Sequence, residues 1–476
     1  MSFNYFFLIL LIIIISLINS KVTIPFKLQN YIPETSKDDF IINYIFKNLI
    51  VNLEVGTPPQ PITLSACLGE YNTIIFGANC KRYDKGVYNE TKSETYEVIG
   101  NDSATVFELY WDANKTKDIF KFNKNEIKEY QFMNALEYNK DRNCYDIFCE
   151  ILMEPGFLGF LVQPHKQAQY EIDKFNFISQ LKKYNLIQQY DFYFDFISEN
   201  SGNIIIGALP NEINPDDYKN KILTNIKVLQ TDDKYRLDWS LRFDDIYYGE
   251  NKIKKELESE AVVRVEFGFI QGNYDMLKEV EKDFFEELKD KKKCFKKDTN
   301  AFGFSFNYYY CNKDVNLDNF KPWKFTINSF ETNFTFTKED LVLDLGDKYL
   351  FLMVFDTSSK LILGYPFLKK YQFIFNQDKK TFGYFHNKPE EENEFPLGYI
   401  VIISILSAVL IGLGIFAVIY FLKYRQKKKM MAKELSDETE TDKANNNEGL
   451  IPNEEKDETV KANNNEGLIP NEENNQ

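Results

Sequence analysis

Histidine is almost absent from this 476-residue sequence, which contains only His165 and His386. Neither lies at ligand spacing from a cysteine or carboxylate, so we expect neither a histidine-based metal site nor a serine–histidine–aspartate triad. Basic residues are also in deficit, because 57 lysines and arginines face 72 acids and give a net charge of −15. A nucleic-acid binder needs a basic stripe that displaces counterions. We therefore expect no metal, no cofactor and no nucleic-acid partner.

Long apolar runs occur at both ends of the chain. The first, between Tyr5 and Ile15, is followed by small or polar residues and predicts a signal peptide over 1–20, with an uncleaved anchor as the alternative. The second, over 397–422, contains no charge and is long enough to cross a bilayer of about 30 Å. An acidic stalk over 389–396 precedes it, and Lys423 and Arg425 follow it.

The positive-inside rule then places the C-terminus in the cytosol. The sequence therefore predicts a single-pass type I membrane protein that contacts lipid through one helix, at the plasma membrane or in an endomembrane vesicle. Its N-terminal part would be lumenal or extracellular. Four glycosylation sequons agree with that compartment, and they begin at Asn89, Asn101, Asn114 and Asn333.

All six cysteines precede the predicted span, which suits an oxidising compartment. Cys294 and Cys311 bracket one segment, and we expect them to pair. Cys80, Cys144 and Cys149 are candidates for another bridge whose connectivity the sequence leaves open.

The predicted cytosolic tail, 423–476, is polar and acidic and contains KANNNEGLIPNEE twice, from Lys443 and from Lys461. Such a composition predicts disorder, and two copies are too few to stack into a solenoid. The Leu-Ile pair in each copy has two interpretations. It is either a signal for cytosolic sorting machinery or part of a plain spacer.

Between about 43 and 385 the sequence alternates short apolar strands with turns, which predicts a large, mostly β domain. Only two segments have a convincing helical pattern, near 173–184 and near 274–292.

Several ordered motifs in this region resemble the pepsin-like aspartic peptidases. GTPPQ, in the stretch that starts at Val51, is similar to the turn of that family's first catalytic hairpin. Further matches extend almost to the predicted membrane span. They are EPGFLGF from Glu154, FNFISQLKKYNLIQQYDFYFDF from Phe175, SGNIIIGALP from Ser201, LDWSLRFDDIYYGE around Trp239 and LILGYPFLKKYQFIFNQDKKTFGYF from Leu361.

The resemblance implies a bilobal, mostly β fold with a deep cleft, one aspartate from each lobe at the cleft floor, and a β-hairpin flap above it. We expect an N-terminal lead or short pro-segment over 21–42, an N-terminal lobe over 43–198 and a C-terminal lobe over 199–388. Hydrolysis requires two adjacent carboxyl groups, because one must activate a water while the other holds a proton.

Both catalytic aspartates of the family are replaced in this sequence. Counted from GTPPQ, the first family aspartate falls on Cys67, with Gly69 and Glu70 on the cleft floor. The segment from Ala261 aligns the second with Arg264 and the family's following glycine with Glu266. Because arginine stays protonated, it cannot act as a general base.

Two interpretations of this altered floor remain open. Arg264 would lower the pKa of Cys67 and create a reactive thiolate, or Cys67 is an apolar filler and Arg264 pairs with Glu266 or Glu70. Asp344 and Asp356 lie outside the catalytic frame, and we do not expect either to replace the missing aspartates.

The flap segment also departs from the family pattern. Tyr110 falls on the flap tyrosine, but Trp111 replaces the flexible glycine that follows it. A sugar on Asn114 would stand near the flap tip. The alternative is that Tyr110 is an ordinary strand residue.

The sequence therefore predicts a membrane-anchored, catalytically inactive pseudopeptidase that binds a peptide or protein ligand in its cleft. The alternative is an active, acid-pH aspartic endopeptidase anchored in the membrane.

Overall fold

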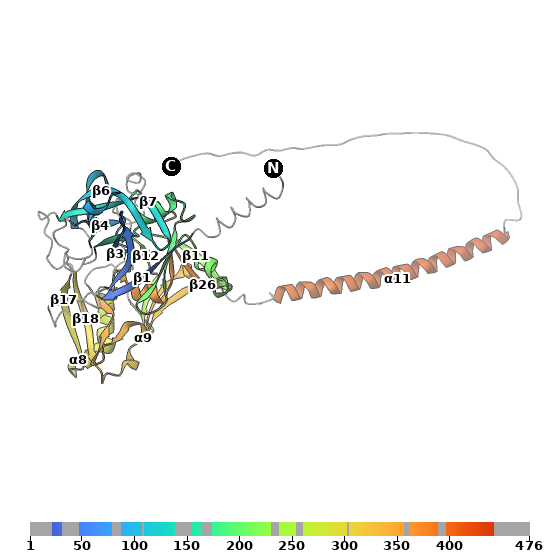
Figure 1. The fold of residues 1–476 in the computed structure, drawn as a ribbon. Helices are drawn as coiled ribbons and strands as arrows, with labels where there is room; N and C mark the ends of the chain where they lie inside the picture. The colour runs from blue at the N-terminus through green and yellow to red at the C-terminus, as the bar shows by residue number, and fades with distance from the viewer. Residues whose placement is uncertain are drawn as a thin grey trace, which may run out of the picture. The chain divides into compact units, whose positions relative to one another are not determined.

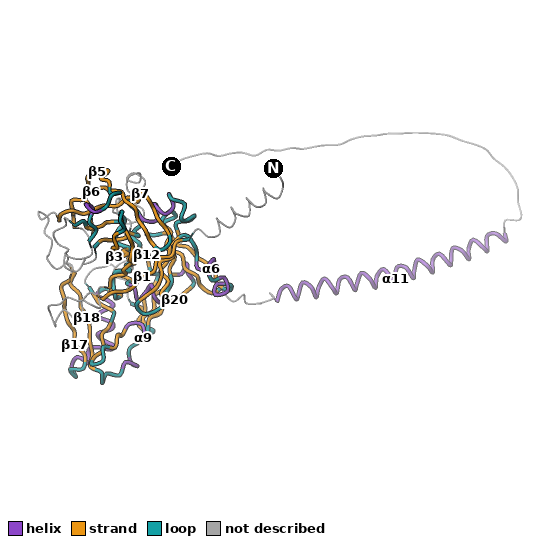
Figure 2. Tube along the Cα trace, viewed as in Figure 1, coloured by secondary structure: helices purple, strands orange, loops and turns teal. Residues whose placement is uncertain are grey.

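The computed structural model describes residues 21–30, 47–78, 87–106, 109–138, 155–162, 174–229, 238–253, 260–301, 304–356, 361–388 and 397–441. The chain divides into two units, Met1–Pro389 and Glu390–Gln476. The first unit is mostly β structure, as predicted (Figures 1 and 2). In it, β6 and β7 lie toward one end, and β17, β18 and α8 lie toward the other (Figure 1).

The largest sheet has 13 strands and includes residues from both ends of the first unit. Its strands, in spatial order, are β11 (Lys221–Lys227), β26 (Thr381–Asn387), β25 (Phe373–Asn376), β9 (Asp191–Phe196), β10 (Ser201–Ile206), β1 (Val22–Asn30), β2 (Lys47–Val55), β3 (Gln60–Cys67), β8 (Gly156–Gly159), β4 (Ile74–Phe76), β7 (Asn125–Tyr138), β6 (Leu109–Phe122) and β5 (Glu97–Val106).

The segment predicted as an N-terminal lead supplies β1 to this sheet, between β10 and β2. Val22, Ile24, Phe26 and Leu28 alternate with exposed or half-buried residues, as expected for a strand with one buried face. Residues 22–30 are therefore part of the fold. The predicted boundary between lobes, 198/199, falls between the hairpin partners β9 and β10 and stays a prediction.

Two smaller sheets complete the β structure. One is ordered β12 (Ser240–Arg242), β15 (Glu260–Val263), β24 (Leu361–Leu363), β16 (Ile270–Gly272), β23 (Met353–Phe355), β18 (Phe304–Asn312), β22 (Lys348–Phe351) and β21 (Val342–Asp344), and β17 (Cys294–Ala301) pairs with β18. The other is ordered β14 (Asn251–Lys252), β13 (Asp245–Tyr248), β19 (Trp323–Ile327) and β20 (Thr332–Phe336).

Both predicted helices of this unit are present. The first is α5 (Phe177–Lys183), and the side chain of Asn176 caps it by accepting from Ser179 N. The second is divided into α7 (Tyr274–Val280), a π-helical turn η4 (Glu281–Phe285) and α8 (Glu286–Asp290). The sequence missed the short helices α6 (Pro210–Ile213), α9 (Lys338–Leu341) and α10 (Tyr365–Lys370), and the 3-10 turns η2 (Glu90–Lys92), η3 (Pro215–Tyr218), η5 (Leu317–Asn319) and η6 (Asn328–Phe330).

The core is rich in aromatic residues, in keeping with 43 phenylalanines and 30 tyrosines in the sequence. Trp239 is fully buried in it, with its ring 5.0 Å from that of Phe375 and 5.8 Å from that of Phe192. Its indole nitrogen donates to the carbonyl of Phe160 at 2.8 Å. This bond joins the segment that follows β8 to the segment that precedes β12.

The predicted disulfide between Cys294 and Cys311 is confirmed and joins opposite residues of β17 and β18. Other predictions lie outside the described residues: the signal peptide, the acidic stalk, the repeats from residue 443, His165, Cys80, Cys144 and Cys149.

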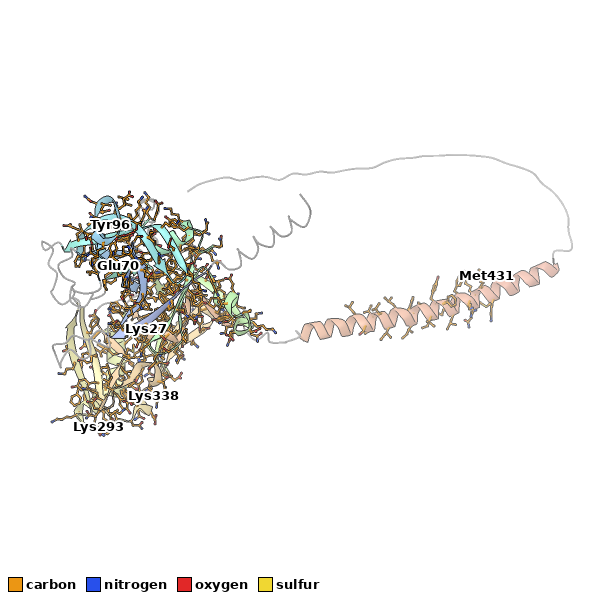
Figure 3. All side chains as sticks on the ribbon, in the orientation of Figure 1. Lys27, Glu70, Tyr96, Lys293, Lys338 and Met431 are labelled. Carbon is orange, nitrogen blue, oxygen red and sulfur yellow. A yellow bond between two sulfur atoms is a disulfide. The ribbon has the colours of Figure 1, made fainter. Side chains whose placement is uncertain are left out.

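The second unit contains one long helix, α11 (Leu397–Thr441). Its segment Leu406–Met431 contains an 18-residue window with a mean hydropathy of 2.2 and no buried side chains, so the segment is a candidate membrane span (Figure 3). The helix begins at the predicted residue and continues beyond the predicted end, residue 422. Residues 423–434 contain Lys, Arg, Gln, Met, Ala, Glu and few poor helix formers, which favours continuation of the helix past residue 422.

Candidate functional site

Two loops at the ends of strands are related by an internal repeat of sheet topology. In the first half, β3 pairs in parallel with β8, β8 pairs antiparallel with β4, and β4 pairs in parallel with β7. In the second half, β15, β24, β16 and β23 repeat the same sequence of pairings. We call residues 67–71 the first loop and residues 264–268 the second loop.

The register of these strands makes Cys67 and Arg264 equivalent positions. Cys67 is opposite Gly159, which follows Leu158. Val263 is opposite Leu363, so Arg264 is level with Gly364. Both glycines are required, since a Cβ would lie 2.5 Å from the carbonyl carbon of Tyr71 at Gly159 and 2.2 Å from the carbonyl oxygen of Phe267 at Gly364.

Side chains of the second loop hold the backbone of Leu68 in the first loop. The amide of Leu68 donates to Glu266 Oε2 at 3.3 Å, and its carbonyl accepts from Arg264 Nη1 at 3.2 Å. Gly69 leaves the space for this contact, because a Cβ there would lie 2.8 Å from Glu266 Oε1. We call this arrangement of Leu68, Gly69, Arg264 and Glu266 the loop clamp.

Arg264 forms its closest ion pair with Asp238, at 2.8 Å between Nη2 and Oδ1. The expected pair with Glu266 is longer, at 3.8 Å from Nε to Oε1. Burial opposes the charge of Arg264, but Asp238 and Glu266 outweigh it and raise its pKa above the ordinary value. The guanidinium is therefore a permanent cation.

Cys67 is buried and reduced, with its sulfur 3.4 Å from Glu266 Oε1. It packs in an apolar cluster with Phe76, Trp111 and Phe157. Burial, Glu266 and Glu70 together raise the pKa of the thiol well above its ordinary value, and the opposing effect of Arg264 is smaller. Of the two interpretations, these contacts favour Cys67 as a buried, protonated filler over a thiolate stabilised by Arg264, because burial and two carboxylates outweigh the guanidinium.

Carboxylates are concentrated around the two loops. Glu70 and Glu266 are both buried, and both act electrostatically on Cys67. Figure 3 labels Glu70 among the packed side chains of the first unit. The sequence analysis did not identify Asp238 as a partner of Arg264. The available signal was its position directly before Trp239, within a motif that resembles the family. Among the described residues, no group of three or more histidine, cysteine or acidic side chains is arranged to hold a metal ion.

The predicted flap corresponds to the hairpin of β5 and β6, in which Tyr110 is opposite Thr105. The side chain of Tyr110 lies outside the described residues. Trp111 is buried, with its ring 4.9 Å from that of Phe76. Trp111 thus fixes this hairpin to the cluster that contains Cys67, where a glycine would give the backbone more freedom.

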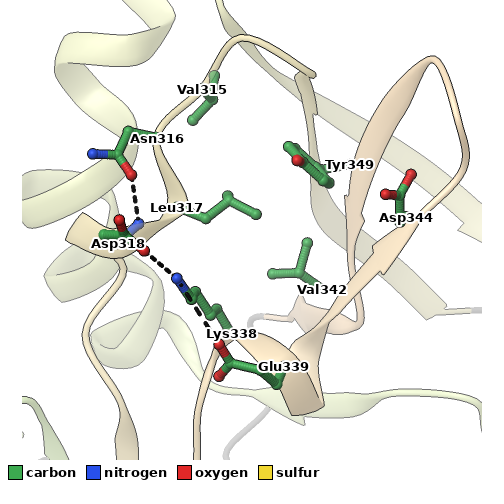
Figure 4. A pocket seen from close by; sticks show the side chains of 9 residues that line it. All are labelled: Val315, Asn316, Leu317, Asp318, Lys338, Glu339, Val342, Asp344 and Tyr349. Atoms are coloured by element: carbon green, nitrogen blue, oxygen red, sulfur yellow. Dashed lines mark hydrogen bonds and ion pairs between the residues drawn. The ribbon is translucent and has the colours of Figure 1, made fainter.

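A hollow of about 380 Å³ lies in the second half of the β domain (Figure 4). None of its lining residues belongs to the first or the second loop. It includes Asp344, which is paired with Lys313 at 2.5 Å, as well as Lys338, whose partner is Asp318. The remaining lining residues are Val315, Asn316, Leu317, Glu339, Val342 and Tyr349.

Asp356 does not line this hollow. It is buried, and its amide donates to Gly272 O.

The pattern of the family described as eukaryotic aspartyl protease matches residues 48–386, more than half of the chain. No curated protein matches the chain.

Proposed function

Because the chain belongs to the eukaryotic aspartyl protease family, we propose that it is a catalytically inactive, membrane-anchored member that binds a peptide or protein segment in its cleft. The observation that carries this proposal is the equivalence of Cys67 and Arg264 at the ends of β3 and β15. Aspartic peptidases need two carboxyl groups that share a proton at such a pair of positions.

Neither side chain supplies the missing chemistry. Arg264 has no lone pair available at any physiological pH and cannot activate a water. The Cys67 thiol stays protonated because its pKa is raised, and it faces an apolar cluster and the carboxylate of Glu266. The loop clamp thus holds the two loops together through the hydrogen bonds of Arg264 and Glu266 to the backbone of Leu68, in place of a carboxyl dyad.

The rival function is acid-pH endopeptidase activity that uses Glu70 and Glu266. One observation favours it, since both carboxyl groups are buried near Cys67. The contacts of Glu266 argue against it. Its two oxygens receive the Leu68 amide and the Cys67 thiol and lie near Arg264, so they are committed to the clamp.

Peptide binding does not require the dyad, because strand edges beside a cleft can hold an extended backbone by hydrogen bonds. The charge asymmetry around the candidate span supports a lumenal or extracellular position for the β domain and a cytosolic C-terminus. In that orientation the Leu-Ile pairs of the tail would be accessible to cytosolic sorting machinery.

The test uses full-length protein in detergent and a broad peptide library at acidic pH, with and without a transition-state-mimic inhibitor of aspartic peptidases. We expect library peptides to be retained and no inhibitor-sensitive cleavage to occur. Cleavage that is lost in Glu70→Gln or Glu266→Gln would overturn the proposal in favour of the rival. Absence of both retention and cleavage would refute the binding function.

A further inference from the structure

The four sequons differ in exposure and in their place in the sheets. Asn101 and Asn333 are exposed, whereas Asn89 and Asn114 are half-buried. Asn101 lies on β5, the last strand of the 13-stranded sheet, and Asn333 lies on β20, the last strand of the four-stranded sheet. Both exposed sequons therefore lie on edge strands.

The edge at β5 has features that invite association. Among the described strands, none pairs with its outer side. The register of β5 shifts between Val98 and Gly100, and Val98 is 46% and Ile99 41% exposed there. An edge strand with exposed apolar side chains is a template for pairing with another chain. Asn101 follows this apolar pair by two residues.

The edge at β20 is partly covered near its end. The amide of Thr335 donates to the Tyr371 hydroxyl at 2.6 Å, and the hydroxyl donates to the Thr335 carbonyl at 2.8 Å. The backbone of Thr335 thus faces away from β19. Because backbone direction repeats every two residues in an antiparallel strand, Asn333 presents its amide and carbonyl to the same outer side.

Asn114 is in a different environment. It is on β6, between β5 and β7, in a cross-strand row with Asn101 and Asn134. The Tyr96 oxygen accepts from Asn134 Nδ2 at 3.0 Å, and the side chain of Asn114 lies near the same tyrosine. The only donor in an asparagine side chain is Nδ2, the atom that would carry a sugar. A sugar attached there would have to fit on a half-buried side chain of an inner strand, between its cross-strand neighbours Asn101 and Asn134.

We infer that Asn101 and Asn333 carry N-linked oligosaccharides that shield the edges of β5 and β20, and that Asn114 stays unmodified. The inference rests on the lumenal orientation in the proposed function. In the modification, a C–N bond forms between C1 of the first sugar and Asn Nδ2. The bond from C1 to the pyrophosphate of a lipid-linked oligosaccharide donor breaks, and Nδ2 loses one proton.

The physical advantage lies in the size and hydration of the sugar. Exposed edges are otherwise protected by charge, proline or a covering element. A hydrated oligosaccharide at Asn101 or Asn333 would prevent a second strand from approaching within the roughly 4.8 Å that ladder hydrogen bonds require.

The first measurement is sugar occupancy at each sequon. Full-length protein is produced in a eukaryotic secretory host, and its peptides are analysed by mass spectrometry after enzymatic removal of N-glycans. We expect occupancy at Asn101 and Asn333 and none at Asn114. Occupancy at Asn114, or vacancy at either edge site in a chain glycosylated elsewhere, overturns the inference. Vacancy at all four sequons overturns it as well. In that case protease is added to sealed vesicles, and protection of the β domain shows whether its lumenal orientation still holds.

The second measurement tests the shielding. Ser103→Ala together with Thr335→Ala removes both edge sequons and keeps both asparagines. Thr91→Ala removes the sequon of Asn89, which is not on an edge strand, and serves as the matched control. By size-exclusion chromatography with light scattering in detergent, we expect the edge variant to contain several-fold more oligomer than the control. Equal monodispersity of the two variants overturns the shielding.

Discussion

Glu266 Oε1 lies 3.4 Å from the sulfur of Cys67, so a carboxylate that follows β15 contacts a thiol at the end of β3. The same carboxylate receives the amide of Leu68. The loop clamp therefore depends on an acid in the second loop and on the absence of a side chain at Gly69 in the first.

The clamp predicts energetic coupling between Gly69 and Glu266. In Gly69→Ala the new Cβ would lie only 2.8 Å from Glu266 Oε1, so the Glu266 carboxylate has to move away. The buried amide of Leu68 then loses its acceptor. We expect a loss of about 1–3 kcal/mol in the free energy of unfolding. Chemical denaturation of Glu266→Ala and of the double variant completes the cycle, in which we expect a coupling energy of about 1 kcal/mol.

Gly100→Ala is the matched control for this cycle. Its Cβ would meet only Lys115 side-chain atoms, the nearest at 3.7 Å, which is ordinary contact. Strictly additive effects of Gly69→Ala and Glu266→Ala would show that the two residues do not act together.

A second prediction concerns the charge balance around Arg264. In Arg264→Met, Asp238 and Glu266 lose the cation between them, and the Leu68 carbonyl loses a donor. Removing one partner of a largely buried ion pair destabilises a protein by about 3 kcal/mol. Denaturation should show this loss in Arg264→Met and a smaller one in Arg264→Lys, which keeps the charge. A wild-type midpoint in Arg264→Met would mean that the ion pair is not important for stability.

The sequence predicted those features of the fold that depend on local pattern. The two longer helices of the β domain, the Cys294–Cys311 disulfide and the start of α11 agree with apolar periodicity and spacing. Glu266 was placed on the cleft floor because it follows Arg264 by two residues, and the structure brings it to Leu68 and Cys67. Its role in the clamp depends on an approach between loops that are 199 residues apart.

Other features depend on tertiary contacts that no local pattern contains. Asp238 becomes the main partner of Arg264 only when the segment before β12 packs beside β15. The residues of β1 were expected to belong to an N-terminal lead, because their pairing with β10 and β2 is visible only in the fold. The sequence left the state of Cys67 open between a thiolate and an apolar filler, because its burial and the combined effect of Glu266 and Glu70 are evident only in the fold.

A third prediction follows from that raised pKa. Cys67 should resist alkylation by iodoacetamide at neutral pH in the folded, full-length protein, because the thiol is buried and protonated. In denaturant it should react fully within the same time. Mass spectrometry of the peptide that contains Cys67 measures both rates, and rapid labelling under native conditions would restore the thiolate interpretation.

The last prediction concerns pH and two acids of β9. Burial raises the pKa of Asp191 and of Asp195, against hydrogen bonds from Asn376 and Gln372 that lower it. Below the ordinary aspartate pKa both folded and unfolded states are protonated, so neither acid lowers stability. As the pH rises from that value through the raised folded pKa, the folded state acquires buried charge and loses stability.

The β domain should therefore gain stability from these two acids on acidification toward the ordinary aspartate range. Asp191→Asn keeps an acceptor for Asn376 and removes one titrating group, so its unfolding free energy should vary less with pH across that window and should exceed that of the wild type at neutral pH. Asp216→Asn, on the exposed turn η3, is the control and should follow the wild-type curve. Chemical denaturation of full-length protein at several pH values measures all three curves. An Asp191→Asn curve parallel to the wild type would show that this carboxyl group does not govern the acid stability of the fold.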